Sequence, residues 1–525
     1  MQYTAIMNKI LTALTLMLAA GLAGCSKDDG ANVPITGISI TETKTVQIGQ
    51  TVQLTVTVMP ENATEKPDFA WSSSDSGVAT VDDSGNVTAH STGDAIITVR
   101  LRSNEAVQAT CTVTGSEETA EYDPDEVVEF EDSKFQALTL YYDKNNDGKL
   151  QAWEAALVTE LELSGQSIKS LQGIEYFTEL ESLNCTSNLL TSLDVTNNRK
   201  LRALWCKSNQ IVSLDVTPLR DLQILNCESN RLTSLDVSQN TELVHLLCGM
   251  NNGAMTDDDG ITKIDVSNNP KLETLSVYYL NLSELDVTNN PSLKKLDFGM
   301  CCHTRWGDLT PIEHIDLSRN PELEELNCAS SNYPGFGLDE LDVSNNPKLK
   351  RLTTYGNPKL GSLDLSRNPE LKTLNCCHNS LSALDVTKCP KIDTLYCAYN
   401  EIGTLDLTQS AELVWINCQN NRIDKLDVSN TKIGYLMASD NRIASVNMGD
   451  KTFDTPSPSG SGYEDAGLPY LYINLNNNQL TDIDLSKQKY LYWLEISGNR
   501  LTSLDLTGCS KVGGVLCGDN SLTSL

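Results

Sequence analysis

Residues 178–201, TELESLNCTSNLLTSLDVTNNRKL, decide the fold of this chain because their pattern is repeated. It returns from Leu201 as LRALWCKSNQIVSLDV and from Leu222 as LQILNCESNRLTSLDV. The shared template is L-x-x-L-x-C-x-x-N-x-L-x-x-L-D-V, and Cys185 and Cys206 mark its period of 21 residues. One such unit cannot bury its apolar face alone, so the pattern predicts a stack of equivalent turns around a continuous core.

The cysteine position of this template can be followed through sixteen turns within residues 161–525. Apolar residues such as Val277 and Phe298 replace cysteine in some turns, so the position faces inward and its thiols behave as small hydrophobic groups. Side chains on stacked turns point the same way, which is poor geometry for disulfides, so we expect reduced cysteines. The period and the apolar spacing resemble those of internalin-like leucine-rich repeats. The cysteine position falls on residues 163, 185, 206, 227, 248, 277, 298, 328, 354, 376, 397, 418, 438, 475, 496 and 517.

Two polar residues recur beside the cysteine position. An asparagine follows it by three residues, and its amide is expected to bond main-chain groups of neighbouring turns. The aspartate of L-D-V is expected to cap a turn together with the following Ser or Thr, and weak calcium bridging along the column is the alternative. The asparagines are residues 188, 209, 230, 251, 357, 379, 400, 421, 441, 478, 499 and 520, and the aspartates are residues 194, 215, 236, 265, 286, 316, 342, 364, 385, 406, 427, 484 and 505.

The composition excludes some classes of partner. The chain has 525 residues, of which 39% are apolar, and this is ample for several packed domains. Its formal net charge is −31, whereas binding to nucleic acid or to an anionic membrane surface needs a basic patch. We therefore expect no nucleic-acid partner.

The first 24 residues resemble a bacterial lipoprotein signal. A short segment with Lys9 precedes an apolar run, and Leu-Ala-Gly stands directly before Cys25. The resemblance implies that Cys25 is the lipid-attachment residue, that residues 25–32 form a tether, and that the chain touches the membrane only through this anchor. The following SKDD is similar to the tag of surface-exposed outer-membrane lipoproteins in Bacteroidetes. An ordinary cleaved signal is the alternative.

Residues 33–115 have a different character, with short alternating runs such as QLTVTVMP and AIITVRL between Gly, Pro, Asn and Asp. This pattern predicts a small β-sandwich. The strings PENAT, WSSSD and GNVTA resemble bacterial Ig-like domains (group 2), which implies a spacer that holds a binding head away from the cell. Residues 116–130 are acidic and predict a linker.

Residues 131–160 are predicted to form a helical cap around an EF-hand-like loop. Helices are expected over 135–142 and 155–161, on either side of DKNNDGKLQAWE. This loop has oxygen donors at positions 1, 3, 5 and 12 and glycine at position 6, the pattern of a Ca²⁺ loop. The resemblance implies a structural Ca²⁺ that braces the first turn, and a metal-free loop is the alternative. The expected metal-binding residues are Asp143, Asn145, Asp147, Lys149 (through its carbonyl) and Glu154.

Aromatic residues recur on the predicted concave face. Strand alternation places there the residues on either side of the cysteine position and the one two before it. Exposed Trp and Tyr beside Asn are typical of an interaction surface for proteins or sugar rings, and packing of the aromatics on one another is the alternative. Insertions at 250–260, 300–311 and 330–339 enter at one phase and are expected at one rim of this face. The predicted ligand-binding residues are Trp205, Tyr278, Tyr355, Tyr396, Trp415, Tyr435, Tyr472 and Trp493.

Two Cys-Cys-His runs, at 301–303 and 376–378, have residue types found in zinc sites. Adjacent ligands are poorly spaced for a tetrahedral site and the two runs lie three turns apart, so we expect no zinc. No nucleophile elbow, phosphate loop or HExxH motif occurs, and none of the five histidines has a recognisable catalytic setting. The sequence therefore predicts that the chain is not an enzyme.

The whole chain resembles the leucine-rich repeat surface lipoproteins of Bacteroidetes. The expected fold is multidomain, with an all-β Ig-like sandwich, a short helical EF-hand-like cap and a leucine-rich repeat solenoid of about 16 turns. The resemblance implies adhesion to, or binding of, a host or microbial surface protein on the concave face. A glycan-binding accessory lipoprotein and an envelope structural protein without a specific ligand are the alternatives.

Overall fold

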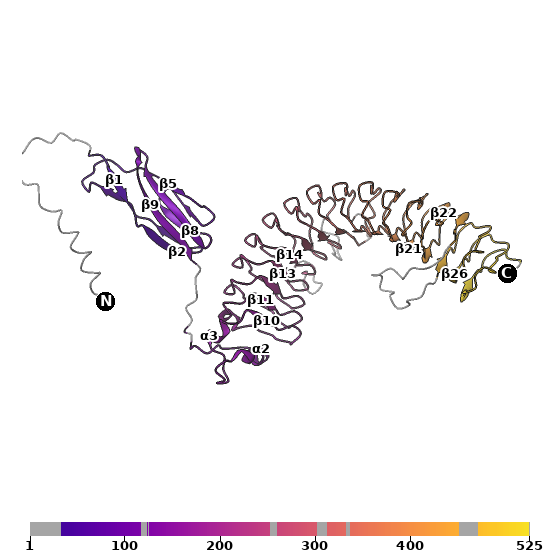
Figure 1. Cartoon of the computed structure of the whole chain (residues 1–525), viewed down its shortest axis with the longest axis horizontal. Coiled ribbons are helices and arrows are strands. Elements are labelled where there is room, and N and C mark those ends of the chain that lie inside the picture. The colour runs from indigo at the N-terminus through magenta and orange to yellow at the C-terminus, as the bar shows by residue number, and fades with distance from the viewer. Residues whose placement is uncertain are drawn as a thin grey trace, which may run out of the picture. The chain divides into compact units, whose positions relative to one another are not determined.

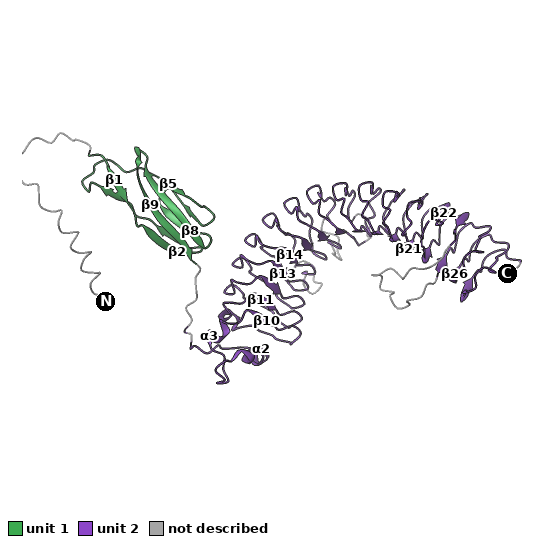
Figure 2. Cartoon of the chain, viewed as in Figure 1, with its two compact units in different colours: residues 1–121 green, residues 122–525 purple. Residues whose placement is uncertain are grey.

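The computed structural model describes residues 33–116, 123, 125–251, 260–301, 312–331, 336–450 and 471–523. The chain divides into two compact units after Glu121 (Figure 2). The predicted leader, the lipid-attachment residue Cys25 and the tether lie outside the described residues. Within the part of the chain that is described, no helix is long and apolar enough to cross a membrane.

The first unit is a β-sandwich. Its larger sheet has the order β2-β9-β8-β5, and a smaller sheet has the order β3-β7-β6. Strand β8 alternates exposed and buried residues, as expected for a strand with one face on a core. The predicted β-sandwich is confirmed as a fold, and its last strand ends at Ser116. The strands are β1 (Gly37–Ser39), β2 (Thr43–Gln47), β3 (Thr51–Gln53), β4 (Thr57–Met59), β5 (Phe69–Ser73), β6 (Ala79–Val81), β7 (Asn86–Ala89), β8 (Gly93–Leu101) and β9 (Asn104–Ser116).

The second unit begins with a small cap on the first turn of the solenoid. Helix α2 (Ser133–Thr139) continues into the 3-10 helix η1 (Leu140–Tyr142), close to the first predicted helix. Helix α3 covers only Ala152–Ala155, and the chain then enters strand β10 (Glu160–Glu162). Leu161 is buried there as the inward residue of the first turn, so the helix predicted over 155–161 is wrong.

The end of the predicted linker packs into this cap. Val128 is buried, and the ring of Phe130 packs edge-on against that of Phe135 with centroids 5.1 Å apart. One apolar cluster then runs from Val128 to Cys509. The cap and the solenoid therefore share a single core.

Sixteen parallel strands line the solenoid, one for each predicted turn. Neighbouring strands are in register, so that Leu183 of β11 lies beside Leu204 of β12. Figure 1 shows the strands following one another along the inner side of the curved second unit. The other elements are the 3-10 helix η2 (Ile174–Tyr176) and a pair of short strands, β22 (Lys425–Asp427) and β24 (Ser445–Asn447). After β10, the strands of the long sheet are β11 (Ser182–Asn184), β12 (Ala203–Trp205), β13 (Ile224–Asn226), β14 (His245–Leu247), β15 (Thr274–Ser276), β16 (Lys295–Asp297), β17 (Glu325–Asn327), β18 (Arg351–Thr353), β19 (Thr373–Asn375), β20 (Thr394–Tyr396), β21 (Trp415–Asn417), β23 (Tyr435–Met437), β25 (Leu471–Asn474), β26 (Leu491–Glu495) and β27 (Gly514–Leu516).

A tight turn follows most of these strands. The second residue after the cysteine position has a positive φ, for example 55° at Ser229 and 57° at His378. Such a left-handed residue reverses the chain abruptly. The reversal leaves main-chain N–H and C=O groups in the interior, and these groups need hydrogen-bond partners.

Candidate functional site

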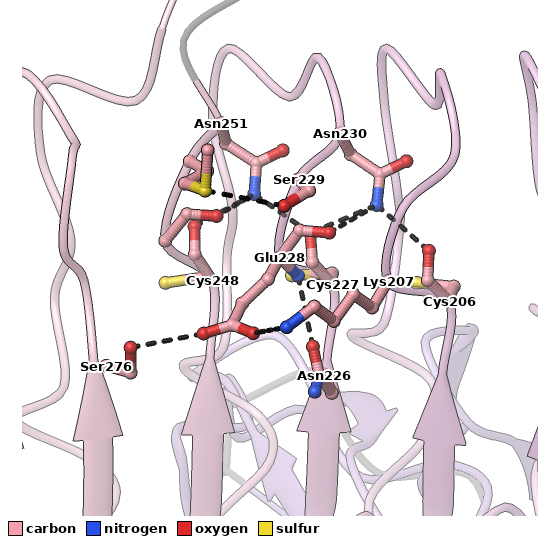
Figure 3. Close-up of polar contacts among 12 residues, drawn as sticks. Cys206, Lys207, Asn226, Cys227, Glu228, Ser229, Asn230, Cys248, Asn251 and Ser276 are labelled. Atoms are coloured by element: carbon pink, nitrogen blue, oxygen red, sulfur yellow. Dashed lines mark hydrogen bonds and ion pairs between the residues drawn. The ribbon is translucent and has the colours of Figure 1, made fainter. Parts of the chain in front are cut away.

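The first asparagine ladder supplies those partners. Nδ2 of Asn230 donates to the carbonyl oxygens of Cys227 in its own turn (3.1 Å) and Cys206 in the turn before (3.0 Å), as Figure 3 shows. Its Oδ1 accepts from the N–H of Ile211 at 3.0 Å. The predicted role of these asparagines is confirmed, because each amide joins two turns through main-chain groups.

A second asparagine ladder lies four residues after the L-D-V aspartate. This ladder was not predicted from the sequence. Nδ2 of Asn290 donates to the main-chain oxygens of Val266 (3.0 Å) and Asn269 (2.9 Å) in the preceding turn. The side chains of this ladder are fully buried, and their Oδ1 atoms have no hydrogen-bond partner among the described residues. Their position resembles that of an ordinary polar turn residue, which hid the ladder. Its members are Asn198, Asn240, Asn269, Asn290, Asn320, Asn346 and Asn368.

The aspartate column caps turns on the outside of the solenoid. Oδ1 of Asp385 accepts from the main-chain N–H (2.8 Å) and the hydroxyl (2.7 Å) of Thr387. These hydrogen bonds, the hydroxyl's first, hold the pKa of Asp385 below its usual value. The turn-capping interpretation is confirmed, because the carboxylate finds its donors two residues away.

The cysteine column is a row of mostly buried thiols. In the described turns, the cysteines at the cysteine position form no disulfides, and most of them are buried. Burial raises the pKa of Cys185 and of Cys418 to about 12, so these thiols stay protonated at neutral pH. Of the two Cys-Cys-His runs, residues 302–303 lie outside the described residues, whereas His378 stacks on Tyr399 with ring centroids 4.2 Å apart.

The EF-hand-like loop is held by its own hydrogen bonds. The two carboxylate oxygens of Asp143 accept from the N–H groups of Asn146 (2.6 Å) and Gly148 (2.8 Å), and Gly148 has a φ of 82°. Oε1 of the buried Glu154 accepts from the N–H of Lys144 at 2.7 Å. Among the described residues, no group of three or more His, Cys, Asp or Glu could hold a metal ion as it stands. The oxygen donors suit Ca²⁺ by type, but their carboxylates are not gathered around one point.

Calcium binding therefore stays a prediction, with Asp143, Asn145, Asp147 and Glu154 as side-chain ligands and Lys149 as a carbonyl ligand. Added Ca²⁺ is expected to raise the melting temperature of the chain relative to EDTA, because an ion that binds only the folded loop stabilises it by mass action. Calorimetry with and without Ca²⁺ measures this shift, and Glu154→Gln should remove it. A melting temperature that ignores Ca²⁺ would show that the hydrogen bonds alone hold the loop.

The concave face carries the third and the first residue before the cysteine position. Strand β21 illustrates this: Trp415 and Asn417 flank Ile416, which is fully buried. The prediction that the residue two before the cysteine faces outward is wrong, because strand alternation turns it into the core. Of the predicted aromatics, Trp415, Tyr435, Tyr472 and Trp493 take the third position, Trp205 and Tyr396 take the first, and Tyr278 and Tyr355 follow the cysteine position.

Several of these aromatic rings contact one another. Trp415 and Tyr435 are stacked, with ring centroids 4.2 Å apart and an interplanar angle of 20°. Tyr396 and Tyr472 continue the row at centroid distances of 6.3 and 6.2 Å. Only 8% of Trp415 is exposed, so this residue is a packed ring and not an exposed platform. The predicted track of exposed aromatics is a row of half-buried rings with one buried member.

A carboxylate surrounded by neutral donors orders the end of this row. Oε1 of Glu495 accepts from the Tyr472 hydroxyl (2.8 Å) and the Trp493 indole N–H (3.1 Å). Its Oε2 accepts from the amides of Asn474 (2.9 Å) and Asn476 (3.1 Å). Burial, followed by the hydrogen bond to Glu495, raises the pKa of Tyr472 to about 12. Four donors fill the acceptor positions of the carboxylate and fix the side chains around it.

The same part of the concave face carries no charge. On β19, β20, β21, β23 and β25, which are adjacent in the sheet, neither outward position holds an acidic or basic residue. Charged residues make up 21% of the chain, and they return on either side, at Arg351 of β18 and Glu495 of β26. A neutral face rich in aromatics and amides is typical of an interaction surface. This neutral face consists of Thr373, Asn375, Thr394, Tyr396, Trp415, Asn417, Tyr435, Met437, Tyr472 and Asn474.

The earlier strands carry a charged cluster that the sequence did not reveal. Glu228 is 5% exposed, and its carboxylate accepts from Lys207 Nζ at 2.8 Å and from the Ser276 hydroxyl at 3.2 Å (Figure 3). The Glu228 side chain extends across the intervening turn, where Gly249 takes the equivalent position. The ring of Tyr278 lies over this glycine, since a Cβ added to Gly249 would lie 2.5 Å from Cδ1 of Tyr278. The members come from turns separated by an insertion, so no fixed spacing indicates them.

Comparisons with known proteins agree with this architecture. Residues 34–113 match the family model of the bacterial Ig-like domain (group 2). The chain is similar to the solved functional domain of InlJ from Listeria monocytogenes, which includes a cysteine ladder: identity is 29%, the match covers 74% of this chain and 78% of that one, and the TM-score is 0.60. The chain thus combines a bacterial Ig-like domain with an internalin-like leucine-rich repeat solenoid.

Two other proteins match shorter parts of the chain. An uncharacterized protein of Clostridium acetobutylicum is 42% identical over 66 residues, which are 13% of this chain and 16% of that protein. The polysaccharide lyase 8 family protein HylA of Enterococcus faecalis is 32% identical over 165 residues, which are 31% of this chain and 11% of that protein. The chain spans too little of either relative for an activity to be carried over.

Proposed function

We propose that this chain is a binding protein whose neutral face takes a protein partner. The observation that carries the proposal is the lack of charge at the outward positions of five adjacent strands, in a chain with a net charge of −31. Aromatic rings supply contact area there, and amides supply hydrogen bonds without any charge that must be desolvated. The internalin-like solenoid supports an interaction role, because its parallel strands form one extended surface for a partner.

A protein suits this face better than a sugar does. A sugar ring stacks on an aromatic face that is open, whereas the faces of Trp415 and Tyr435 cover each other at 4.2 Å. What the face offers instead is ring edges and amides such as that of Asn417, which suit main-chain and side-chain groups of a polypeptide. Glycan binding is the second candidate, because rings beside amides also occur in sugar sites.

We also propose that the chain is a lipoprotein of the outer membrane, anchored through Cys25 and exposed on the cell surface. The signal-like first residues support the anchor. The Ig-like domain at residues 34–113 would act as the spacer between this anchor and the solenoid. A mass spectrum of the mature protein tests the anchor, which would appear as acyl groups on an N-terminal Cys25.

The binding proposal is tested by adding one charge to the neutral face. Asn417→Arg is expected to weaken partner binding about ten-fold or more, because the partner would bury an unpaired charge. The matched control is Asn184→Arg, which changes the same strand position on β11. Both variants, immobilised as the chain from residue 26 onward, are offered to surface-protein fractions and to a glycan array, and bound material is quantified.

Protein capture that Asn417→Arg loses and Asn184→Arg keeps would support the proposal. Equal capture by both variants would contradict it. Sugar binding that disappears only in Asn417→Arg would favour the glycan candidate instead.

A further inference from the structure

A cavity of about 320 Å³ opens on the concave face over strands β15 to β18. It lies next to the neutral face, because β18 pairs with β19. Most of the side chains that line it are polar or charged, although Leu275, Leu296 and Leu326 also contribute to its lining. The side chains that matter below are Ser276, Lys295, Asp297, Glu325, Asn327 and Arg351.

Both basic side chains of the cavity form ion pairs with the same acid, Glu325. Nζ of Lys295 lies 3.1 Å from Oε1 of Glu325, and Nη2 of Arg351 lies 2.7 Å from the same oxygen. The two basic side chains are 54% and 60% exposed, so they stand at the mouth of the cavity and not at its floor. Glu325 is thereby paired with two cations, so these three side chains together carry a net charge of +1.

The second acid, Asp297, has only neutral donors. Its Oδ1 accepts from the N–H of Gly299 and from Nδ2 of Asn327, both at 3.0 Å. Among the described residues, no Lys or Arg forms an ion pair with it. Burial raises the pKa of Asp297 against these two hydrogen bonds, and the Glu228 carboxylate raises it further. A carboxylate with little water and no counterion gains strongly from an added positive charge.

The neighbouring groups do not compete for that charge. Glu228 already pairs with Lys207 at 2.8 Å. Ser276 donates its proton to Glu228 at 3.2 Å (Figure 3), so the lone pairs of its oxygen remain available as acceptors. The interior of the cavity therefore has one acid without a counterion and additional oxygen acceptors.

We infer that this cavity takes a cationic side chain of the protein partner, with the Asp297 carboxylate as the counterion of its guanidinium or ammonium group. The inference rests on the proposed function for the source of that group. The volume is at the lower end for ligand pockets, which fits one side chain and not a whole drug-sized molecule. Guanidinium is the better match, because its planar set of donors reaches a carboxylate and neighbouring oxygens together.

The test uses a small probe in place of the partner. Nα-acetyl-arginine amide is titrated into the full chain by calorimetry, and Nα-acetyl-citrulline amide, which has the same shape without the charge, is the control probe. We expect saturable binding of the arginine probe and binding of the citrulline probe that is about ten-fold weaker or absent. Asp297→Asn should remove this difference. Glu284→Gln, which removes a 77% exposed acid elsewhere, should leave it unchanged.

A second variant fills the cavity from within. Asn327→Lys places an ammonium group where an amide now lies 3.0 Å from Asp297, so it should abolish probe binding and raise the melting temperature. Equal binding of the two probes, or arginine binding that survives both changes, would overturn the inference. Either result would leave the proposed function standing, because Asn417→Arg tests that function on other strands.

Discussion

Replacing Asn290 with alanine is expected to lower the free energy of unfolding by about 2 to 4 kcal/mol, because it leaves two buried carbonyl groups without a hydrogen-bond donor. The amide of Asn290 now donates to the main-chain oxygens of Val266 at 3.0 Å and Asn269 at 2.9 Å, where water has no access. The loss is partly offset, since the side-chain oxygen that disappears has no donor in the described structure. Urea unfolding followed by circular dichroism measures the change.

The chain contains its own control for this change. Asn289 is the adjacent residue and is exposed, so Asn289→Ala should shift the unfolding midpoint only slightly. Asn290→Cys should fall between the two alanine variants, because Cys389 and Cys509 occupy the equivalent position and direct Sγ at a carbonyl oxygen at 3.8 and 3.5 Å. Equal losses for Asn289→Ala and Asn290→Ala would show that the second ladder contributes nothing.

Trp415→Ala is expected to cost about 3 to 5 kcal/mol of folding stability, as truncation of a buried aromatic does. Trp415 is 8% exposed and stacks on Tyr435 at 4.2 Å, so alanine would leave a cavity in the aromatic row. Trp415→Phe should cost much less, because a smaller ring still fills most of the space. Tyr141→Ala, at an aromatic that is 86% exposed, should be nearly neutral. A Trp415→Ala protein as stable as the Tyr141→Ala protein would show that the row is not packed.

This second prediction decides how binding is to be tested. A binding loss in Trp415→Ala would follow from damage to the sheet, whichever ligand the face takes. Asn417, two residues away on β21, is half-buried and outward, so its replacement changes the surface and spares the stack. For that reason the charge-addition variant is the informative one.

The repeating parts of the fold can be predicted from the sequence because each turn restates the same physical constraints. Sixteen turns, their inward cysteines, the first asparagine ladder and the capping aspartates all follow from one template, and the structure has them. The Ig-like sandwich is predictable for the same reason, since alternation within short runs marks a half-buried strand. The prediction of a helix over 155–161 is wrong because the repeat pattern already begins within this segment, where Leu161 is the inward residue of the first strand.

What could not be predicted depends on contacts between turns. The cavity at Asp297 joins residues from four strands whose spacing in the sequence is irregular, so no motif marks it. The burial of Trp415 depends on Tyr435 in the next strand, and a single turn read alone shows only an outward tryptophan. The second ladder was hidden because Asn289 and Asn290 look alike in sequence, although one is exposed and the other buried.

The asparagine ladders also determine where this protein can change. Asn499 bonds the carbonyl oxygen of Leu475, 24 residues earlier, and Asn478 bonds that of Ala438, 40 residues earlier, both at 2.9 Å. The hydrogen bond between turns is therefore the same whether the intervening segment is short or long. Related proteins can therefore gain, lengthen or exchange the segments between turns while the hydrogen bonds between the turns stay the same. Changes in these segments can alter which partner is bound without altering the fold.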